Sequence, residues 1–229
     1  MEMGEEVKLL GFWPSPYAIK PKIALHLKSV DYEYIEETLQ SKSDLLLETN
    51  PVYQKIPVLL HNNKPVCESL NIVEYIDEAF PSTPSILPAE PYDRAIQRFW
   101  AAYIDEWFPT FREVALAQSE EVRRAAIEKV KEGMSLLEDA FVKCSKGKPF
   151  FSGDNIGYLD IALGSYLGWL YVYEKLSNIN ALNKEETPSL LAWAERFSAS
   201  DAVKDYMPEV DRLMEFAKII MPRFKAASN

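Results

Sequence analysis

Hydrophobic residues change their spacing several times along the first part of the chain, which predicts alternating strands and helices. Residues 7–13 form a short apolar run typical of a strand, residues 32–35 alternate as a strand does, and residues 19–27 between them have helical spacing. A further helical turn is expected at residues 45–47, just before an Asn-Pro pair. This order predicts a mixed sheet with helices on its faces.

The next stretch reads as a hairpin followed by a helix. Short apolar strands at residues 58–60 and 65–67 flank Asn62 and Asn63, which can supply the positive backbone angles of a tight turn. From Leu70 the hydrophobic period becomes helical. The hairpin and its helix complete the sheet region.

Prolines separate this region from a helical remainder. They interrupt the stretch after residue 80 too often for a continuous helix or a central strand, at positions 81, 84, 88 and 91. We therefore expect one domain over residues 1–80, a linker over residues 81–92 and a second domain over residues 93–229.

The second domain is expected to be a bundle of five or more helices. Its first helix carries an unusually aromatic stripe between Ile96 and Phe111, and Gly164 and Gly168 permit close helix packing further on. The remaining helical segments lie at residues 122–141, 158–173, 190–197 and 210–220.

Composition and charge limit the possible partners. The chain has 229 residues, 48% of them hydrophobic, and a formal net charge of -10. Such an acidic surface argues against binding to nucleic acid or anionic lipid. The longest apolar run contains Asp160 and is shorter than the ~20 residues that span a bilayer.

Cysteine usage and the start of the chain bear on the compartment. Cys67 and Cys144 are the only cysteines, without a Cys-x-x-Cys pair, and the acidic first residues lack a cleavable apolar region. We expect a reducing, cytoplasmic environment.

Several familiar chemistries lack their residues. His26 and His61 are far apart in sequence and no cysteine pair accompanies them, so no metal site is expected. Glycine-rich phosphate loops and a Gly-x-Ser-x-Gly elbow are absent. Adjacent carboxylates are frequent, but in a chain with 35 acidic residues they are expected to be solvated.

Glu68 and Ser69 occupy the step from strand to helix. A helix start favours an anion such as a carboxylate, which the Ser69 hydroxyl can also bind, and Glu68 can accept a hydrogen bond from an ammonium group. Together they suit the zwitterionic head of an α-amino acid. The alternative is that Ser69 only caps its helix and Glu68 is solvated.

Ser15 follows the first strand and lies between two prolines. Ligands of open sheets usually bind at the carboxyl ends of strands, and a hydroxyl there, with free N–H groups, would stabilise a thiolate. The alternative is a helix cap with Pro16 at the first helical position.

Three segments of the first domain together resemble a known family: Phe-Trp-Pro-Ser-Pro-Tyr (residues 12–17), Asn-Pro-Val-Tyr-Gln-Lys-Ile-Pro-Val-Leu (50–59) and Cys-Glu-Ser-Leu-Asn-Ile-Val-Glu-Tyr-Ile (67–76). They look like the plant tau class of the cytosolic glutathione transferases, and residues 99–101 and 151–163 resemble its helical-domain signatures. The resemblance implies a thioredoxin-like α/β domain with a mixed four-stranded sheet, followed by an all-α domain.

The resemblance assigns roles in a glutathione site. Ser15 would stabilise the glutathione thiolate, and Glu68 and Ser69 would hold the γ-glutamyl head. Lys42 and Lys55 would meet the glycine carboxylate.

Three further positions follow from the resemblance. Ile56 would pair its backbone with the tripeptide's cysteine, and the bond before Pro57 would be cis. Asp160 would cap a buried helix in a folding role. Pro21, one turn inside the first helix, departs from the family pattern, so we expect that helix to start later or to be kinked.

The expected activity is conjugation of glutathione to hydrophobic electrophiles in detoxification, by a homodimer that holds no permanent cofactor. A serine at position 15 cannot form a mixed disulfide, which favours conjugation over thiol-disulfide exchange, and Cys67 is expected to be a buried apolar residue. Glutathione-dependent peroxidase activity and a non-catalytic ligand carrier of the same fold are the alternatives. The expected co-substrate pocket is mostly aromatic, with candidate residues Phe12, Pro14, Trp107, Phe111, Arg112, Trp169 and Phe216.

Overall fold

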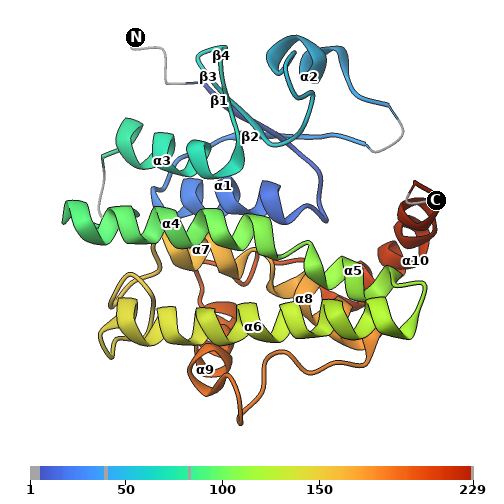
Figure 1. Ribbon diagram of the computed structural model, residues 1–229. Helices are drawn as coiled ribbons and strands as arrows, with labels where there is room; N and C mark the ends of the chain where they lie inside the picture. The colour runs from blue at the N-terminus through green and yellow to red at the C-terminus, as the bar shows by residue number, and fades with distance from the viewer. Residues whose placement is uncertain (1–5, 39–40, 82–83, 228–229) are drawn as a thin grey trace. The chain divides into compact units, whose positions relative to one another are not determined.

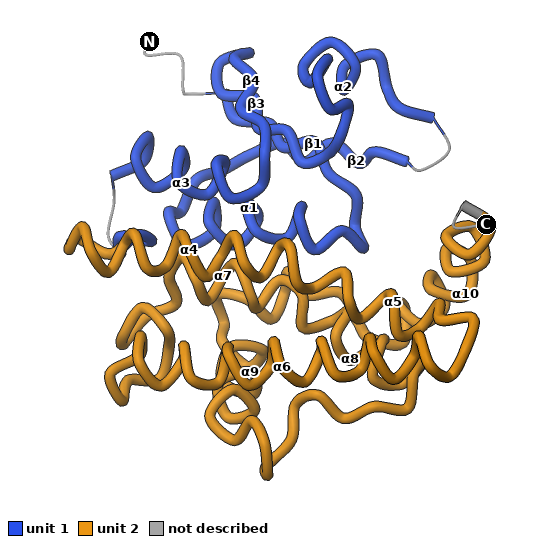
Figure 2. Tube along the Cα trace, in the orientation of Figure 1, with its two compact units in different colours: residues 1–87 blue, residues 88–229 orange. Residues whose placement is uncertain are grey.

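The computed structural model describes residues 6–38, 41–81 and 84–227, and the chain divides into two compact units, residues 1–87 and 88–229 (Figure 2). The division lies within the proline-rich stretch after residue 80.

The first unit alternates strands and short helices (Figure 1). In chain order its elements are β1 (Val7–Gly11), α1 (Pro16–Leu27), β2 (Glu33–Glu36), α2 (Asp44–Thr49), β3 (Val58–His61), β4 (Lys64–Cys67) and α3 (Ser69–Ala79).

The four strands form one mixed sheet in the order β2-β1-β3-β4. β1 is parallel to β2 and antiparallel to β3, and β3 is antiparallel to β4. The expected fold class of this unit is confirmed. Its hairpin turn is also confirmed, because Asn62 and Asn63 have φ angles of 50° and 61°, as a two-residue turn between twisted strands requires.

Helices cover both faces of the sheet. The helices α1 and α3 pack against each other on one face, and α2 lies on the other (Figure 1). On the α2 side, Leu46 joins a buried cluster with Leu10, Val58 and Leu60. Burial of this apolar surface holds α2 against the strands.

The end of the first unit is tied back to its helices by Asp77. Its carboxylate accepts hydrogen bonds from the backbone N–H groups of Ile86 and Leu87, both at 2.9 Å, and lies 2.8 Å from Lys28 Nζ. Burial alone would raise the pKa of Asp77, but these hydrogen bonds outweigh it and hold the pKa below its ordinary value. The stabilisation is therefore present above about pH 4 and is lost as the pH falls through the lowered pKa.

The second unit consists of helices in the part of the chain that the structure describes. They are α4 (Pro91–Trp107), α5 (Thr110–Leu116), α6 (Glu120–Ser145), α7 (Tyr158–Gly164), α8 (Leu167–Ser177), α9 (Pro188–Ala199) and α10 (Val210–Ala227). The helix α4 packs on α7, α6 on α5 and α9, and α8 on α10. None of the described helices has an apolar stretch long enough to cross a membrane.

Two segments expected as single helices are each divided in two. The aromatic segment breaks after Trp107, and Pro109, which cannot donate a backbone hydrogen bond, precedes α5. The buried segment breaks at Ser165, whose hydroxyl donates to the carbonyl of Ala162 at 3.2 Å. Hydroxyl bonds of this kind compete with the helical ladder and bend helices.

Asp160 organises the interior of the second unit. Its side chain has 0% exposure, and its oxygens accept from the N–H groups of Phe151 at 2.9 Å, Ser152 at 3.2 Å and Gly157 at 3.1 Å and from Trp193 Nε1 at 2.8 Å. Burial raises the pKa of Asp160 to about 6 against the opposing effect of these four donors, so the group is ionised at neutral pH. One carboxylate thus joins α7, α9 and the loop before α7.

We expect Asp160→Asn to lower the free energy of unfolding at pH 7 by about 3 kcal/mol, because the amide nitrogen faces N–H donors that lose their acceptor. Urea denaturation measures the change. The matched control is Asp154→Asn, at an exposed residue whose carboxylate lies 3.1 Å from Lys148 Nζ, and it should unfold like the wild type. Equal losses in both variants would contradict the assignment.

Candidate functional site

The strand register gathers the predicted glutathione-binding segments at one edge of the sheet. Leu10 pairs with Ile35 on β2 and with Val58 on β3, and Val58 pairs with Cys67 on β4. This edge therefore carries four segments of the chain. Three of them follow β1, β2 and β4, and the fourth precedes β3. Neighbouring strands lie about 4.8 Å apart, so the edge is roughly 14 Å long from the first strand to the fourth. An extended tripeptide is roughly 10 Å long and would cover most of this length.

Ser15 is both a helix cap and an available hydroxyl. It occupies the N-cap of α1, where its Oγ accepts from Ala18 N at 3.4 Å, and its own backbone N–H donates to the carbonyl of Phe12 at 2.9 Å. The cap uses a lone pair of the oxygen and leaves the hydroxyl proton to donate. Ser15 can therefore both cap α1 and donate from its hydroxyl. Its own backbone N–H is already hydrogen-bonded to Phe12 and is not one of the free N–H groups expected near a ligand.

Pro21 neither delays nor ends the first helix. The helix α1 starts at Pro16, directly after Ser15, and continues through Pro21 to Leu27. Pro21 cannot donate to the carbonyl one turn before it, which belongs to Tyr17, an exposed residue. Of the two expected outcomes the later start is wrong, since Ser15 is the N-cap of α1, and the kink stays a prediction.

Glu68 and Ser69 occupy successive positions at the start of α3. Glu68 holds the N-cap position with a φ of 72° and a ψ of 120°, a conformation that costs a non-glycine residue about 1–3 kcal/mol, and its side chain makes no cap hydrogen bond. Ser69 is the first helical residue and is 6% exposed. The alternative in which Ser69 only caps its helix is wrong, because Glu68 is at the cap.

The segment before β3 is fixed by Asn50. Its side chain donates to the carbonyl of Lys55 at 2.9 Å and accepts from Tyr53 N at 3.2 Å. The Ile56-Pro57 bond is cis, as the resemblance implies, and Ile56 packs against the α2 cluster. The Lys55 side chain is exposed at the end of this segment.

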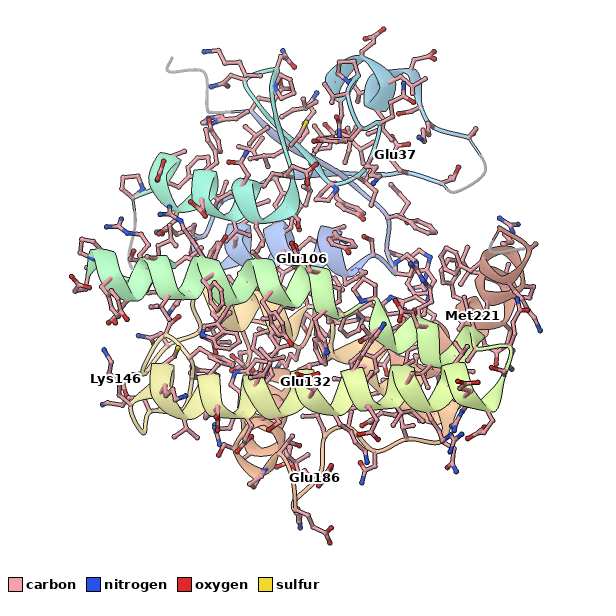
Figure 3. The ribbon with its side chains drawn as sticks, viewed as in Figure 1. Glu37, Glu106, Glu132, Lys146, Glu186 and Met221 are labelled. Carbon is pink, nitrogen blue, oxygen red and sulfur yellow. The ribbon has the colours of Figure 1, made fainter. Side chains whose placement is uncertain are left out.

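Lys42 is exposed and directly precedes Ser43, the N-cap of α2. Ser43 is bound by Glu37, a residue that the sequence interpretation left among the solvated acids. Figure 3 labels the Glu37 side chain in the first unit. Glu37 is 5% exposed and accepts from Ser43 N at 3.2 Å and from the Ser43 hydroxyl. Neighbouring Glu36 accepts from Trp13 N at 3.0 Å, in the loop that carries Ser15.

Cys67 lies beside Glu68 but does not have the features of a reactive thiol. It is half-buried against the α2 cluster, and its sulfur lies 3.7 Å from the carbonyl oxygen of Thr49. Burial, and then the Glu68 carboxylate, raise the pKa of Cys67 above its ordinary value. Because the thiolate is the reactive form, these surroundings favour an inert residue.

The predicted co-substrate residues of the second unit form one row of aromatic contacts. The Phe111 ring lies 5.3 Å from Trp107 and 6.2 Å from Tyr173, measured between centroids. Trp169 continues the row, 5.7 Å from Tyr173 and 6.3 Å from Phe216. Tyr173 was missed in the sequence, although it lies one helical turn after Trp169.

Exposure differs along this row and beside it: Phe111 is 0% and Trp169 8% exposed, whereas Phe216 is half-buried. Trp107 is 6% exposed, and its Nε1 donates to the carbonyl of Lys129 at 3.1 Å, so it anchors α4 to α6. Arg112 is exposed and its guanidinium lies 4.9 Å from the ring centroid of Phe224, a second residue that the sequence interpretation missed. In the first unit, Phe12 is half-buried and Pro14 is buried, both beside Ser15.

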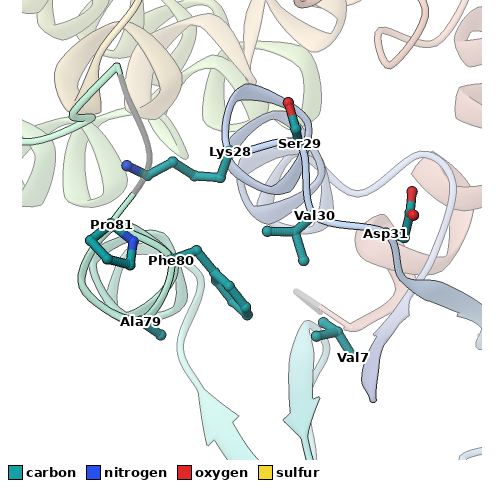
Figure 4. A pocket seen from close by; sticks show the side chains of 8 residues that line it. All are labelled: Val7, Lys28, Ser29, Val30, Asp31, Ala79, Phe80 and Pro81. Atoms are coloured by element: carbon teal, nitrogen blue, oxygen red, sulfur yellow. The ribbon is translucent and has the colours of Figure 1, made fainter. Parts of the chain in front are cut away.

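A cavity of about 540 Å³ lies elsewhere in the first unit, at the start of β1 rather than at its end (Figure 4). Val7, Val30 and Phe80 line it together with Lys28, whose charge already pairs with Asp77. The cavity is therefore separate from the edge that carries Ser15.

Comparison with known proteins identifies the family. The glutathione S-transferase N-terminal domain matches residues 5–78, and the C-terminal domain of the same family matches residues 120–196. Glutathione S-transferase U18 of Arabidopsis thaliana is 58% identical over 97% of this chain and 99% of its own. A tau class enzyme of mango, Mangifera indica, has 62% identity and a TM-score of 0.92 over 94% of this chain and 98% of its own. The chain belongs to the tau class of the glutathione S-transferases.

A second solved structure relates this transferase to its co-substrate. A rice glutathione S-transferase solved in complex with glutathione is 36% identical, with a TM-score of 0.87 over 96% of this chain and 98% of its own. The tau class transferase described here is thus an enzyme that uses glutathione as co-substrate.

Backbone strain and charge at Glu68 can be separated by two variants. Glu68→Gly and Glu68→Ala both remove the carboxylate, but only glycine adopts a φ of 72° without strain. We expect Glu68→Gly to unfold at a higher denaturant concentration, with a free energy of unfolding about 1 kcal/mol above that of Glu68→Ala.

Calorimetry should show that the two Glu68 variants bind glutathione equally weakly, about tenfold below the wild type. An alanine variant as stable as the glycine variant would contradict the strain at this position. Glutathione affinities like that of the wild type in both variants would contradict a role for the carboxylate.

Proposed function

We propose that glutathione binds along the sheet edge, with its γ-glutamyl head at Glu68 and Ser69 and its glycine carboxylate at Lys42 and Lys55. The observation that carries the proposal is the strand register, which brings these segments and Ser15 to one edge. The length of the edge matches an extended tripeptide, and Glu68 after β4 and Lys42 beyond β2 supply opposite charges for its ammonium and carboxylate ends.

Ser15 acts by donating a hydrogen bond from its hydroxyl group to the glutathione sulfur. Because this hydrogen bond favours the thiolate over the thiol, it lowers the thiol pKa from about 8.5 and raises the nucleophile concentration at neutral pH. The thiol proton leaves to solvent, the sulfur forms a bond to carbon of the electrophile, and the leaving group departs with the bonding electrons. The Ala18 N–H, which donates to Ser15 Oγ, orients the hydroxyl for this role.

Electrophile binding is proposed for hydrophobic residues in each unit. Phe12 and Pro14 lie beside Ser15 in sequence and are proposed to contact the electrophile near the sulfur. In the second unit Phe216, which is half-buried, is proposed to present its ring at one end of the aromatic row, whereas Trp107, Phe111 and Trp169 are at most 8% exposed and support it from within the unit; Arg112, next to Phe111 in the chain, adds an exposed charge. Aromatic surfaces of this kind accept varied apolar ligands without fixed hydrogen bonds.

The hydroxyl is tested by Ser15→Ala and Ser15→Gly. Conjugation of a reactive aryl halide at pH 7 should fall at least tenfold, towards the ~10²–10³ typical of a lost hydrogen bond to an anion, while glutathione binding is retained. The pKa seen in the rate profile should rise towards about 8.5, so that activity partly recovers at alkaline pH. Glycine serves as the second variant because it disturbs a helix cap by only a few tenths of a kcal/mol.

Ser15→Thr keeps a hydroxyl and should retain more activity than either variant. Rates equal to wild type in the alanine and glycine variants would remove Ser15 from the mechanism. A wild-type protein that binds glutathione but conjugates no electrophile would instead be the ligand carrier, and turnover of hydroperoxides alone would indicate the peroxidase.

We also propose a cytoplasmic homodimer. Two apolar side chains, Val52 and Tyr53, are 79% and 59% exposed on a turn that Asn50 holds in place, and such residues are common in interfaces. Sedimentation equilibrium at micromolar concentration should give twice the mass of one chain, and Tyr53→Ser should weaken the association. A monomer at that concentration would refute the dimer.

A further inference from the structure

Glu37 is a buried carboxylate at the carboxyl end of β2. Its backbone N–H donates to the carbonyl of Gly11 at 2.7 Å, which extends the β1–β2 ladder past the Gly11 and Glu36 pair. Its side chain is therefore held beside the end of β1, on the same edge as Ser15.

The carboxylate of Glu37 fixes the residue that starts α2. It accepts from the Ser43 N–H and from the Ser43 hydroxyl, and the Ser43 oxygen in turn accepts from Leu46 N at 3.0 Å. Leu46 lies in the buried cluster with Leu10. The hydrogen-bonded chain from Glu37 through Ser43 to Leu46 thus connects the end of β2 to a helix that is already packed on the sheet.

Helix capping alone does not account for an acid at this position. Ser43 caps α2 with its own hydroxyl, and a serine needs no buried carboxylate for that purpose. Burying an anion against neutral donors is costly, whereas a neutral acceptor would hold the hydroxyl at a lower cost. The carboxylate adds a second, charge-assisted hydrogen bond, which it accepts from the backbone N–H of Ser43.

The hydrogen bond from the Ser43 N–H to Glu37 also restrains the main chain of Lys42, because the Lys42 carbonyl and the Ser43 N–H belong to the same peptide unit. The Lys42 side chain is exposed and long, so its average position depends on how firmly its main chain is held. A fixed main chain reduces the freedom lost when the ammonium group meets a carboxylate.

We propose that Glu37 is a positioning residue for glutathione, which acts through Ser43 to place Lys42 at the glycine carboxylate. This inference rests on the proposed binding mode. It assigns to Glu37 an effect on the glycine end of the ligand only.

The test compares two ligands, glutathione and γ-glutamylcysteine, which lacks the glycine. In Glu37→Gln, calorimetry should show a glutathione Kd about three- to tenfold higher, whereas the Kd for γ-glutamylcysteine stays within about twofold. The KM for glutathione should rise by the same factor, with kcat at saturating glutathione unchanged. A double-mutant cycle adds Lys42→Ala, in whose background Glu37→Gln should weaken glutathione binding no further.

The matched control is Glu33→Gln, an exposed residue at the start of the same strand whose carboxylate lies 3.6 Å from Lys8 Nζ. It should bind both ligands like the wild type. Equal losses for both ligands in Glu37→Gln would reduce Glu37 to a general structural role, and an unchanged glutathione Kd would refute the inference. Wild-type protein that binds γ-glutamylcysteine as tightly as glutathione would instead refute the proposed role of Lys42.

Discussion

The candidate site depends on one row of backbone pairs across the sheet, formed by Ile35, Leu10, Val58 and Cys67. Because side chains alternate along a strand, these residues share a face, and they meet the α2 cluster there. A slip of one residue would turn this apolar set away from α2, towards the face that α1 and α3 cover, and would also shift the loops that leave the same edge. The burial that stabilises the first unit therefore also sets the spacing of the groups proposed to bind glutathione.

Polar groups at this edge are proposed to bind the ligand through atoms other than those they use in folding. Ser15 accepts a hydrogen bond at the start of α1, and its hydroxyl proton is the one proposed to be donated to the glutathione sulfur. Glu68 shows the opposite arrangement, because its side chain does not cap α3 although its residue stands at the cap in a strained conformation. The tight packing elsewhere in the unit maintains that strain, and a carboxylate that caps nothing within the chain is available to an ammonium group.

Much of this could be read from the sequence where short-range rules apply. Paired asparagines predicted the hairpin turn, hydrophobic spacing predicted most helices, and a serine between prolines marked the start of α1. Periodicity failed where a break leaves the apolar pattern intact, as at Pro109 and Ser165. The role of Glu37 could not be predicted, because an acid among many is identified as buried only when its partner six residues later is known to fold back on it.

The two units meet different physical demands. Glutathione has fixed charges, so its proposed site consists of ionic and backbone groups on a sheet, whose rigidity limits the entropy lost on binding. Electrophiles vary in shape and share only apolar surface, which the proposed aromatic row from Trp107 to Phe216 would match without charged groups of its own. Elsewhere in the same unit, Asp160 gathers four N–H donors around one buried carboxylate and so joins α7, α9 and the loop before α7. A neutral residue there would leave donors unpaired, so the charge is retained although burial raises its pKa.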